Sequence, residues 1–236
     1  MSDKRLEGKR AVVTGASRGL GWFIARELAG AGARVIVTGR DAETLGDGAA
    51  RIGGNVTAMV CDHSDESTIE EFAKRVVGDG GAPDILVNNA GVFRGRASVA
   101  EMPTELWKSV IDTNLSGVFF TTRAFLPAMI DRGAGGEIVM IASTSGLRAD
   151  PGAAAYNASK FGLRGFSEAL TKEVRSHDIR VNVLCPSSID MTDPPAAEGG
   201  KGARLHAVDL ARTVVHLVTL PGRTLIREME IWGTNP

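Results

Sequence analysis

The single tyrosine of the chain, Tyr156, stands four residues before Lys160, one of seven lysines in 236 residues. On a helix, residues four apart share a face and lie about 6 Å apart along the axis. An ammonium group beside a phenol favours the phenolate and lowers the phenol pKa from its ordinary value of about 10, so the phenol could exchange a proton near neutral pH. Taken alone, the pair favours a plainer interpretation, in which the tyrosine packs and the lysine faces water.

A glycine-rich turn, TGASRGLG at 14–21, leads directly into a helical stretch at 19–31. Glycines here allow a tight turn and a close backbone approach to a pyrophosphate, while the helix N-terminus offers free N–H groups and the positive end of its dipole. Such a turn alone could be a tight strand-to-helix connection. Its place after the first predicted strand and before the first predicted helix favours a dinucleotide site.

The elements that must position these residues alternate along the chain. Short β-branched runs predict strands at 11–14, 34–38, 55–61, 84–88, 137–143, 180–185 and 228–231. Amphipathic stretches predict helices at 19–31, 41–52, 65–79, 103–131, 153–177 and 206–219. The nearly continuous apolar character of the strands indicates that both faces of the sheet are covered. The alternation predicts an α/β fold, a doubly wound parallel sheet of about seven strands with helices on both faces.

We expect residues 1–236 to form one domain, because the chain has no internal repeat, linker or low-complexity tract. The segment 191–203, MTDPPAAEGGKGA, is too rich in proline and glycine for a regular element. It predicts a short substrate flap over about 190–205.

Two helix starts carry predicted N-caps. Asp41 precedes the helical stretch at 41–52, and Ser64 precedes the next one, with Asp65 and Glu66 in its first turn. Side-chain oxygens at these positions accept hydrogen bonds from free N–H groups, and acidic residues favour the positive end of the helix dipole.

The composition argues against several classes of partner. Lysine and arginine number 27 against 28 acidic residues, so the net charge of −1 gives no reason to expect nucleic acid or an anionic membrane. The first ten residues are charged and unlike a signal peptide, and no apolar run approaches a membrane span of about 18 residues. We expect a cytoplasmic protein.

Cysteine and histidine usage predicts no metal site. Cys61 and Cys185 each end a predicted buried strand, so we expect inert core thiols, with a disulfide or redox pair as the less favoured alternative. The four histidines show no metal-binding spacing with one another or with the cysteines.

Four motifs, taken in order, resemble the short-chain dehydrogenase/reductase family. They are TGxxxGxG at 14–21, Asn88-Asn89-Ala90-Gly91 after the fourth predicted strand, Ser143, and Tyr156-xxx-Lys160. The resemblance runs from about Leu6 to Ile189. It implies a Rossmann domain that binds NAD(H) or NADP(H) and transfers hydride to or from a carbonyl carbon.

The resemblance also implies a catalytic set. Tyr156 would donate a proton to the substrate oxygen, and Lys160 would lower the tyrosine pKa and bind the nicotinamide ribose. Ser143 would hold and polarise the carbonyl, and Asn114 would anchor a water beside the lysine. Singly, Ser143 could instead bond to backbone, and Asn114 could be a buried amide in a helix irregularity.

The cofactor site follows from the same resemblance. Thr14 and Asn88 would pin the glycine turn to the neighbouring strand, and Asp62 would lie beside the adenine ring or form an Asx turn, or both. Residues expected to contact the cofactor are Gly15, Ser17, Arg18, Gly19, Leu20, Gly21, Arg40, Asp62, Asn89, Ala90, Gly91, Tyr156, Lys160, Pro186 and Ile189.

The end of the second predicted strand indicates which cofactor is preferred. An acidic residue there usually grips the ribose 2′-hydroxyl of NAD. By resemblance Gly39 occupies that position, Arg40 follows it, and Arg18 lies in the glycine turn. Two guanidinium groups can clamp a 2′-phosphate. We expect NADP(H) to be preferred and NAD(H) to be possible, unless Arg40 is merely exposed and Asp41 reaches the ribose.

The match to the family weakens after the sixth predicted strand. Ser187 replaces a common glycine, Asp190 is an unusual charge, and Met191 stands where a threonine often occurs. The familiar glycine-rich C-terminal segment is also absent. The family often forms a homodimer or homotetramer through the helices at 103–131 and 153–177, which makes an oligomer the expected state.

Three functional hypotheses follow. The first is an NADPH-dependent reductase of a ketone or aldehyde, with a 3-oxoacyl thioester as one candidate substrate. The second is an NAD-dependent secondary alcohol dehydrogenase, and the third is a cofactor-sensing protein without catalysis. The two arginines favour the first, and the complete catalytic set argues against the third.

The predicted pocket residues are Phe93, Arg94, Ser145, Leu147, Met191 and Leu205. Arg94 or Arg96 could meet an anionic group of a substrate, unless both side chains are solvated.

Overall fold

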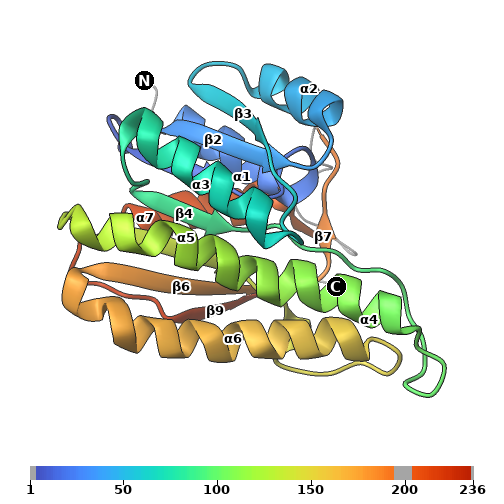
Figure 1. The fold of residues 1–236 in the computed structure, drawn as a ribbon. Coiled ribbons are helices and arrows are strands. Elements are labelled where there is room, and N and C mark those ends of the chain that lie inside the picture. The colour runs from blue at the N-terminus through green and yellow to red at the C-terminus, as the bar shows by residue number, and fades with distance from the viewer. Residues whose placement is uncertain (1–3, 194–203, 235–236) are drawn as a thin grey trace.

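The computed structural model describes residues 4–193 and 204–234, and within them seven parallel strands form one sheet (Figure 1). Its order is β3-β2-β1-β4-β5-β6-β9. The strands are β1 (Arg10–Val13), β2 (Arg34–Gly39), β3 (Val56–Val60), β4 (Ile85–Asn88), β5 (Gly136–Ile141), β6 (Ile179–Pro186) and β9 (Glu228–Ile231). The strand order reverses direction between β1 and β4, which creates a crevice at the carboxyl edge. The predicted doubly wound parallel sheet is confirmed.

Helices cover both faces of the sheet. They are α1 (Gly19–Gly30), α2 (Ala42–Ile52), α3 (Glu66–Gly80), α4 (Thr104–Ile111), α5 (Gly117–Asp131), α6 (Ala154–Val174) and α7 (Ala207–Val218). Helix α1 packs against α7 on one face, and α3 packs against α5 on the other (Figure 1). Because successive strand side chains point to opposite faces, Val13 of β1 joins the core under α1 and Val12 joins the core under α3.

The long helix predicted at 103–131 is interrupted. A π-helical turn, η1 (Asp112–Ser116), joins α4 to α5, and it adds one residue to the helical repeat. The helix predicted at 153–177 ends at Val174 and continues as a short 3-10 turn, η3 (Arg175–His177).

The predicted flap has strands at both of its ends. Strand β7 (Ile189–Asp190) pairs in parallel with β8 (Leu205–His206) in a separate two-stranded sheet, which the proline and glycine content of the segment did not indicate. Residues 194–203 of the flap lie outside the described residues.

One predicted N-cap is confirmed and the other is wrong. Asp41 caps α2, and its carboxylate accepts a bond from the backbone N–H three residues later at 2.8 Å. The cap of α3 is Asp65, which accepts from the N–H of Ser67 at 2.9 Å, rather than Ser64. The hydroxyl of Ser64 is engaged earlier in the turn, where it donates to Asp62 at 2.7 Å.

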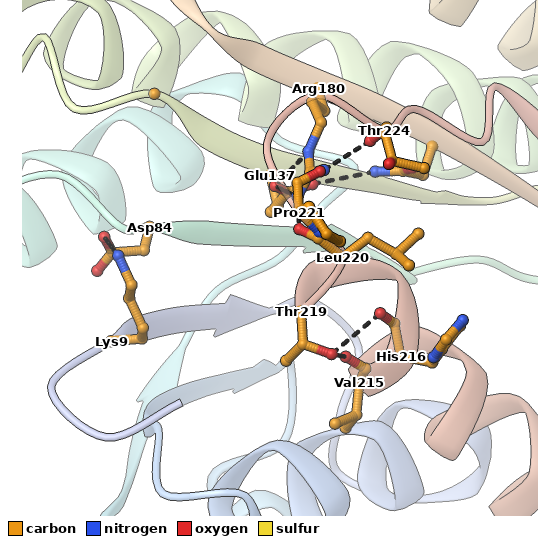
Figure 2. Close-up of polar contacts among 12 residues, drawn as sticks. Lys9, Asp84, Glu137, Arg180, Val215, His216, Thr219, Leu220, Pro221 and Thr224 are labelled. Atoms are coloured by element: carbon orange, nitrogen blue, oxygen red, sulfur yellow. Dashed lines mark hydrogen bonds and ion pairs between the residues drawn. The ribbon is translucent and has the colours of Figure 1, made fainter. Parts of the chain in front are cut away.

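A buried polar network fastens the last strand at the amino edge of the sheet (Figure 2). Arg180 of β6 donates to Glu137 of β5 at 2.7 Å, and Asn182 donates to the other carboxylate oxygen at 3.2 Å. The same guanidinium donates to the carbonyls of Pro221 and Thr224, at 2.8 and 2.6 Å, in the connection from α7 to β9. Burial raises the pKa of Glu137, and the hydrogen bond from Arg180 partly offsets this rise.

Candidate active site

A cleft of about 800 Å³ opens at the carboxyl edge of the sheet. All fifteen residues predicted to contact the cofactor line it, from Gly15 after β1 to Ile189 after β6. Ser143, Tyr156 and Lys160 line it as well, while Asn114 lies fully buried behind its wall. The structure thus brings together the residues that the motifs singled out.

The glycine turn forms a cradle that side chains would fill. Gly15 has a φ of +63°, and a Cβ there would lie 2.7 Å from the Cα of Ala90. A Cβ on Gly21 would lie 2.4 Å from the carbonyl oxygen of Gly15. In the described structure, Arg18 at the N-cap of α1 makes no capping side-chain bond, so the first N–H groups of α1 remain available to a ligand.

Thr14 and Asn89 hold this cradle in place. The hydroxyl of Thr14 accepts from the backbone N–H of Asn89 at 3.0 Å, and the Asn89 amide donates to the carbonyls of Thr14 and Gly15 at 2.9 and 3.0 Å. The prediction that Asn88 shares this role is wrong. Its amide donates to Thr122 of α5 at 3.1 Å, because adjacent strand residues point to opposite faces.

Two exposed arginines, Arg18 after β1 and Arg40 after β2, line the cleft. A Cβ on Gly39 would lie 2.0 Å from the Ser17 hydroxyl, so any side chain there must displace that oxygen. The Asp41 carboxylate caps α2, where it accepts hydrogen bonds from the Thr44 hydroxyl and backbone N–H. These bonds hold the carboxyl pKa below its usual value.

Asp62 lines the cleft and forms the predicted Asx turn, because its carboxylate accepts from the backbone N–H of Ser64 at 2.9 Å. The neighbouring His63, which sequence reasoning examined only as a metal ligand, also lines the cleft. Its ring nitrogens lie 2.6 Å from the Thr38 hydroxyl and 3.2 Å from the Thr121 hydroxyl, and burial lowers its pKa to about 4.

Lys160 is only 4% exposed and donates to the carbonyl of Ile141 at 2.8 Å. Burial lowers the pKa of its ammonium to about 8. Asn114 is close by, since a Cβ on Gly91 would lie 3.4 Å from the Asn114 Oδ1 and 3.7 Å from the Lys160 Nζ.

Asn114 lies within the π-helical turn and fixes the loop after β4. Its Oδ1 accepts from the N–H of Val92 at 2.7 Å, and its Nδ2 donates to the Val92 carbonyl at 2.9 Å and to the Ser159 hydroxyl at 3.2 Å. Asn114 is therefore a buried amide within a helix irregularity, which was the alternative to a catalytic role. It also lies close to Lys160, as the catalytic role requires.

Ser143 and Tyr156 are neighbours in the lining of the cleft. The Ser143 hydroxyl accepts from the N–H of Ser145 at 3.1 Å, which caps the 3-10 turn η2 (Thr144–Gly146). Burial raises the pKa of Tyr156, opposed by a hydrogen bond with Ser143. The structure corrects the prediction that Lys160 lowers this pKa, because burial dominates and the ammonium points toward the Ile141 carbonyl.

A strap, defined as Ile189–Asp193, crosses the start of α1. The Met191 sulfur would lie 3.0 Å from a Cβ on Gly19. Asp193 bridges Arg26 of α1 and Arg51 of α2, at 3.4 and 3.3 Å. Both guanidinium groups also lie over the ring of Trp22, at 4.9 and 4.5 Å.

His206 fastens the same strap from the other side. One ring nitrogen lies 2.7 Å from the Thr192 carbonyl, and the other accepts from the N–H of Val208 at 3.1 Å as the N-cap of α7. This second bond requires an unprotonated Nδ1, so the nitrogen that faces Thr192 carries the hydrogen.

The predicted substrate pocket is only partly correct. Phe93 and Met191 line the cleft, whereas Arg94, Ser145, Leu147 and Leu205 do not. Leu205 packs into the core under α1, and Leu147 packs against the core under α6. The prediction of buried thiols at Cys61 and Cys185 is confirmed, and burial raises the pKa of each to about 11.

Residues 9–198 match the family of short chain dehydrogenases. The chain belongs to the short-chain dehydrogenase/reductase (SDR) family. It is 41% identical over 191 residues to the 3-oxoacyl-[acyl-carrier-protein] reductase FabG of Escherichia coli, covering 79% of this chain and 76% of that protein. A metagenomic short-chain oxidoreductase in complex with NADP has a TM-score of 0.84 and 37% identity, covering 96% of this chain and 97% of that one. An alcohol dehydrogenase from Thermococcus sibiricus complexed with 5-hydroxy-NADP has a TM-score of 0.86 and 28% identity, covering 97% of each.

This SDR is accordingly an NAD(P)-dependent oxidoreductase. The cradle of Gly15, Gly19 and Gly21 fits a dinucleotide pyrophosphate, because a Cβ at any of the three would come within 3.0 Å of a neighbouring atom. Within residues 4–193 and 204–234, no three His, Cys, Asp or Glu side chains group as metal ligands. No helix in those ranges is both long and apolar enough to span a membrane.

Proposed function

We propose that this SDR oxidoreductase reduces a ketone or aldehyde, with Tyr156 as the proton donor and NADP(H) as the preferred cofactor. The observation that carries the proposal is the convergence of Ser143, Tyr156 and Lys160 beside the glycine cradle in one cleft. When bound, the reduced nicotinamide supplies the hydride. The glycine turn, Asn89–Gly91 and Ile189 would hold the cofactor.

Tyr156 and Ser143 are suited to act on the substrate oxygen. Since burial raises the Tyr156 pKa, the phenol keeps its proton near neutral pH and can donate it. The Ser143 oxygen accepts the Ser145 N–H through a lone pair, so its hydroxyl hydrogen, which is shared with Tyr156, can turn to donate to a substrate carbonyl.

Lys160 and Asn114 would support that proton transfer. The Lys160 ammonium has three donors and gives one to Ile141, so two remain for the cofactor ribose and a proton route. Both amide hydrogens of Asn114 are engaged by Val92 and Ser159, so its side chain would hold a water only as an acceptor. We assign Asn114 a positioning role, because it fixes the loop that passes over Lys160.

Three features support the NADP(H) preference. Arg18 and Arg40 are exposed where the cofactor adenosine would lie, and neither forms an ion pair with another described residue. The discriminating position is Gly39, and the nearby carboxylate of Asp41 is held by its cap. Two related solved structures also contain NADP or a derivative of it.

Fluorescence titration of NADPH and NADH tests the cofactor assignment. We expect NADPH to bind more tightly, and Arg40→Ala to weaken NADPH by about tenfold, since a charge-assisted hydrogen bond is worth about 1.5–3 kcal/mol. Arg34→Ala, at an exposed arginine at the other end of β2, is the matched control. Tighter binding of NADH would refute the preference and favour the alternative NAD-dependent alcohol dehydrogenase.

A panel of ketones and aldehydes tests the reaction itself. We expect NADPH-dependent turnover by the wild type that Tyr156→Phe largely abolishes while it still binds NADPH. Equal turnover by Tyr156→Phe would refute the proton donor. Binding without turnover of any carbonyl would favour the cofactor-sensing alternative.

We also propose a homodimer or homotetramer that assembles through α4, α5 and α6. Trp107, Phe119 and Phe161, one on each helix, are large apolar side chains left exposed on these elements. Light scattering with size-exclusion chromatography would measure the mass, and a monomer at micromolar concentration would refute the assembly.

A further inference from the structure

We propose that the cleft takes a neutral carbonyl compound with an aromatic or bulky apolar substituent, and that Phe93 is the residue that selects it. This inference rests on the proposed reductase function and names the substrate class of the same site. Its evidence is the placement of one aromatic ring and the distribution of charge around the reacting groups.

Phe93 is an exposed apolar side chain in the wall of the cleft. It is 53% exposed, and its ring meets the ring of Tyr156 edge to face, with centroids 5.3 Å apart and planes at 87°. Because this ring lies in the lining of the cleft, its exposed surface is available to a ligand that fills the cleft. Because Tyr156 contacts Phe93, a group attached to the reacting carbonyl would lie against the exposed part of the Phe93 ring.

The loop that carries Phe93 is held in place by the segment before α6. The N–H of Ala97 donates to the carbonyl of Gly152 at 2.9 Å, and Arg96 donates to the carbonyl of Pro151 at 2.7 Å. At its other end, Val92 is bonded in both directions to Asn114. Phe93 is thus fixed relative to Tyr156 by the same elements that position the reacting groups.

No cation is available to bind a substrate carboxylate or phosphate among the described residues that line the reacting end of the cleft. The charged lining residues other than Lys160 are Arg18, Arg40, Asp41 and Asp62, all at the adenosine end. Lys160 itself is almost fully buried and bonded to a carbonyl.

Three arginines outside the lining of the cleft are paired with carboxylates. Arg96 lies 3.8 Å from Asp150, Arg148 lies 3.5 Å from Glu230, and Arg164 lies 2.6 Å from Glu228. Arg94 follows Phe93 in sequence and does not line the cleft. A neutral substrate matches the absence of an unpaired cation among the described residues that line the reacting end of the cleft.

Two matched pairs of 2-oxo compounds test the inference. Methyl benzoylformate and benzoylformate share one ketone and one ring and differ in a negative charge, while methyl pyruvate lacks the ring. We expect kcat/KM with NADPH to be at least about tenfold higher for methyl benzoylformate than for benzoylformate, which corresponds to about 1.4 kcal/mol.

Substitutions at Phe93 separate substrate selection from a general effect on Tyr156. Phe93→Ala should lower the ratio of kcat/KM for methyl benzoylformate to kcat/KM for methyl pyruvate by about tenfold, whereas Phe93→Leu should lower this ratio less. Val99→Ala, on the same loop and 79% exposed outside the cleft, is the matched control. Equal loss on both esters in Phe93→Ala would overturn the selecting role.

Two further outcomes keep the inference apart from the proposed function. Preference for benzoylformate, removed by Arg94→Gln, would overturn the neutral substrate class while leaving the reductase intact. If no carbonyl turns over with either cofactor, the proposed function fails. Saturation-transfer NMR of methyl benzoylformate with the protein then decides the inference, because binding that Phe93→Ala removes supports it and absence of binding overturns it.

Discussion

The ammonium of Lys160 donates to the carbonyl oxygen of Ile141, the last residue of β5, at 2.8 Å. A strand end thus holds the side chain in the cleft, and burial brings its pKa down to about 8. The charge that the proposed proton transfer requires is therefore lost not far above neutral pH.

We predict that activity falls as pH rises through about 8. The protonated form of Lys160 is the one that can donate to the cofactor and feed the proton route, and it disappears above its pKa. Lys160→Arg, which keeps its charge over this range, should show lower activity without that fall. The pH profile of kcat/KM at saturating NADPH checks this, and an unchanged descending limb in Lys160→Arg would assign it to another group.

Ser143 should matter twice, as an anchor for the carbonyl and as the partner that opposes the raised Tyr156 pKa. Removing its hydroxyl leaves burial unopposed, so Ser143→Ala should raise the Tyr156 pKa further and lower kcat. General acid catalysis contributes about 10²–10⁴-fold, which sets the scale of the loss in Tyr156→Phe. Ser145→Ala, which keeps the N–H that bonds Ser143, is the control and should retain activity.

Asp193 links the strap to two helices, so its charge should control cofactor release. Asp193→Asn removes both ion pairs with Arg26 and Arg51 and should speed NADPH dissociation several-fold, since partly exposed pairs are each worth about 0–1 kcal/mol. Stopped-flow fluorescence measures the rate. Asp47→Asn, at an exposed site on α2, should leave it unchanged, and equal rates in both variants would exclude the link.

The network at the amino edge of the sheet should affect stability rather than chemistry. Glu137→Gln leaves the Arg180 guanidinium buried without its counter-charge, which costs about 3–5 kcal/mol in comparable pairs. Denaturant unfolding should show this loss, with little change in KM. A stability close to that of the wild type would show that the carbonyls of Pro221 and Thr224 suffice to hold Arg180.

Much of the architecture could be predicted because its determinants are local. Alternating apolar runs define parallel strands, and parallel strands bring their carboxyl ends together, so the glycine turn, Ser143 and Tyr156 had to meet at one edge. Asp41 was predictable as a cap for the same reason, since its partner lies three residues away.

Other features depend on contacts between distant segments. The interchange of Asn88 and Asn89 depends on the face to which each side chain points at the end of β4, and two adjacent asparagines do not reveal that. The bridge from Asp193 to Arg26 spans 167 positions, and the buried His63 contacts Thr121 of α5, 58 positions away. The pKa of Tyr156 was predicted in the wrong direction because spacing shows a neighbouring charge but does not show burial.

The π-helical turn at Asp112–Ser116 affects how the helices on either side of it, α4 and α5, are oriented. One extra residue rotates everything after it by about 100° relative to an unbroken α-helix. Helix α4 packs on α6, and α5 packs on α3. The rotation between α4 and α5 directs the packed face of each helix toward its own neighbour. Asn114 sits at the joint. Deleting one residue there would turn α4 and α5 into one regular helix, whose apolar faces could not pack on α6 and on α3 at the same time. The number of residues in this turn is therefore as strictly constrained as their identity.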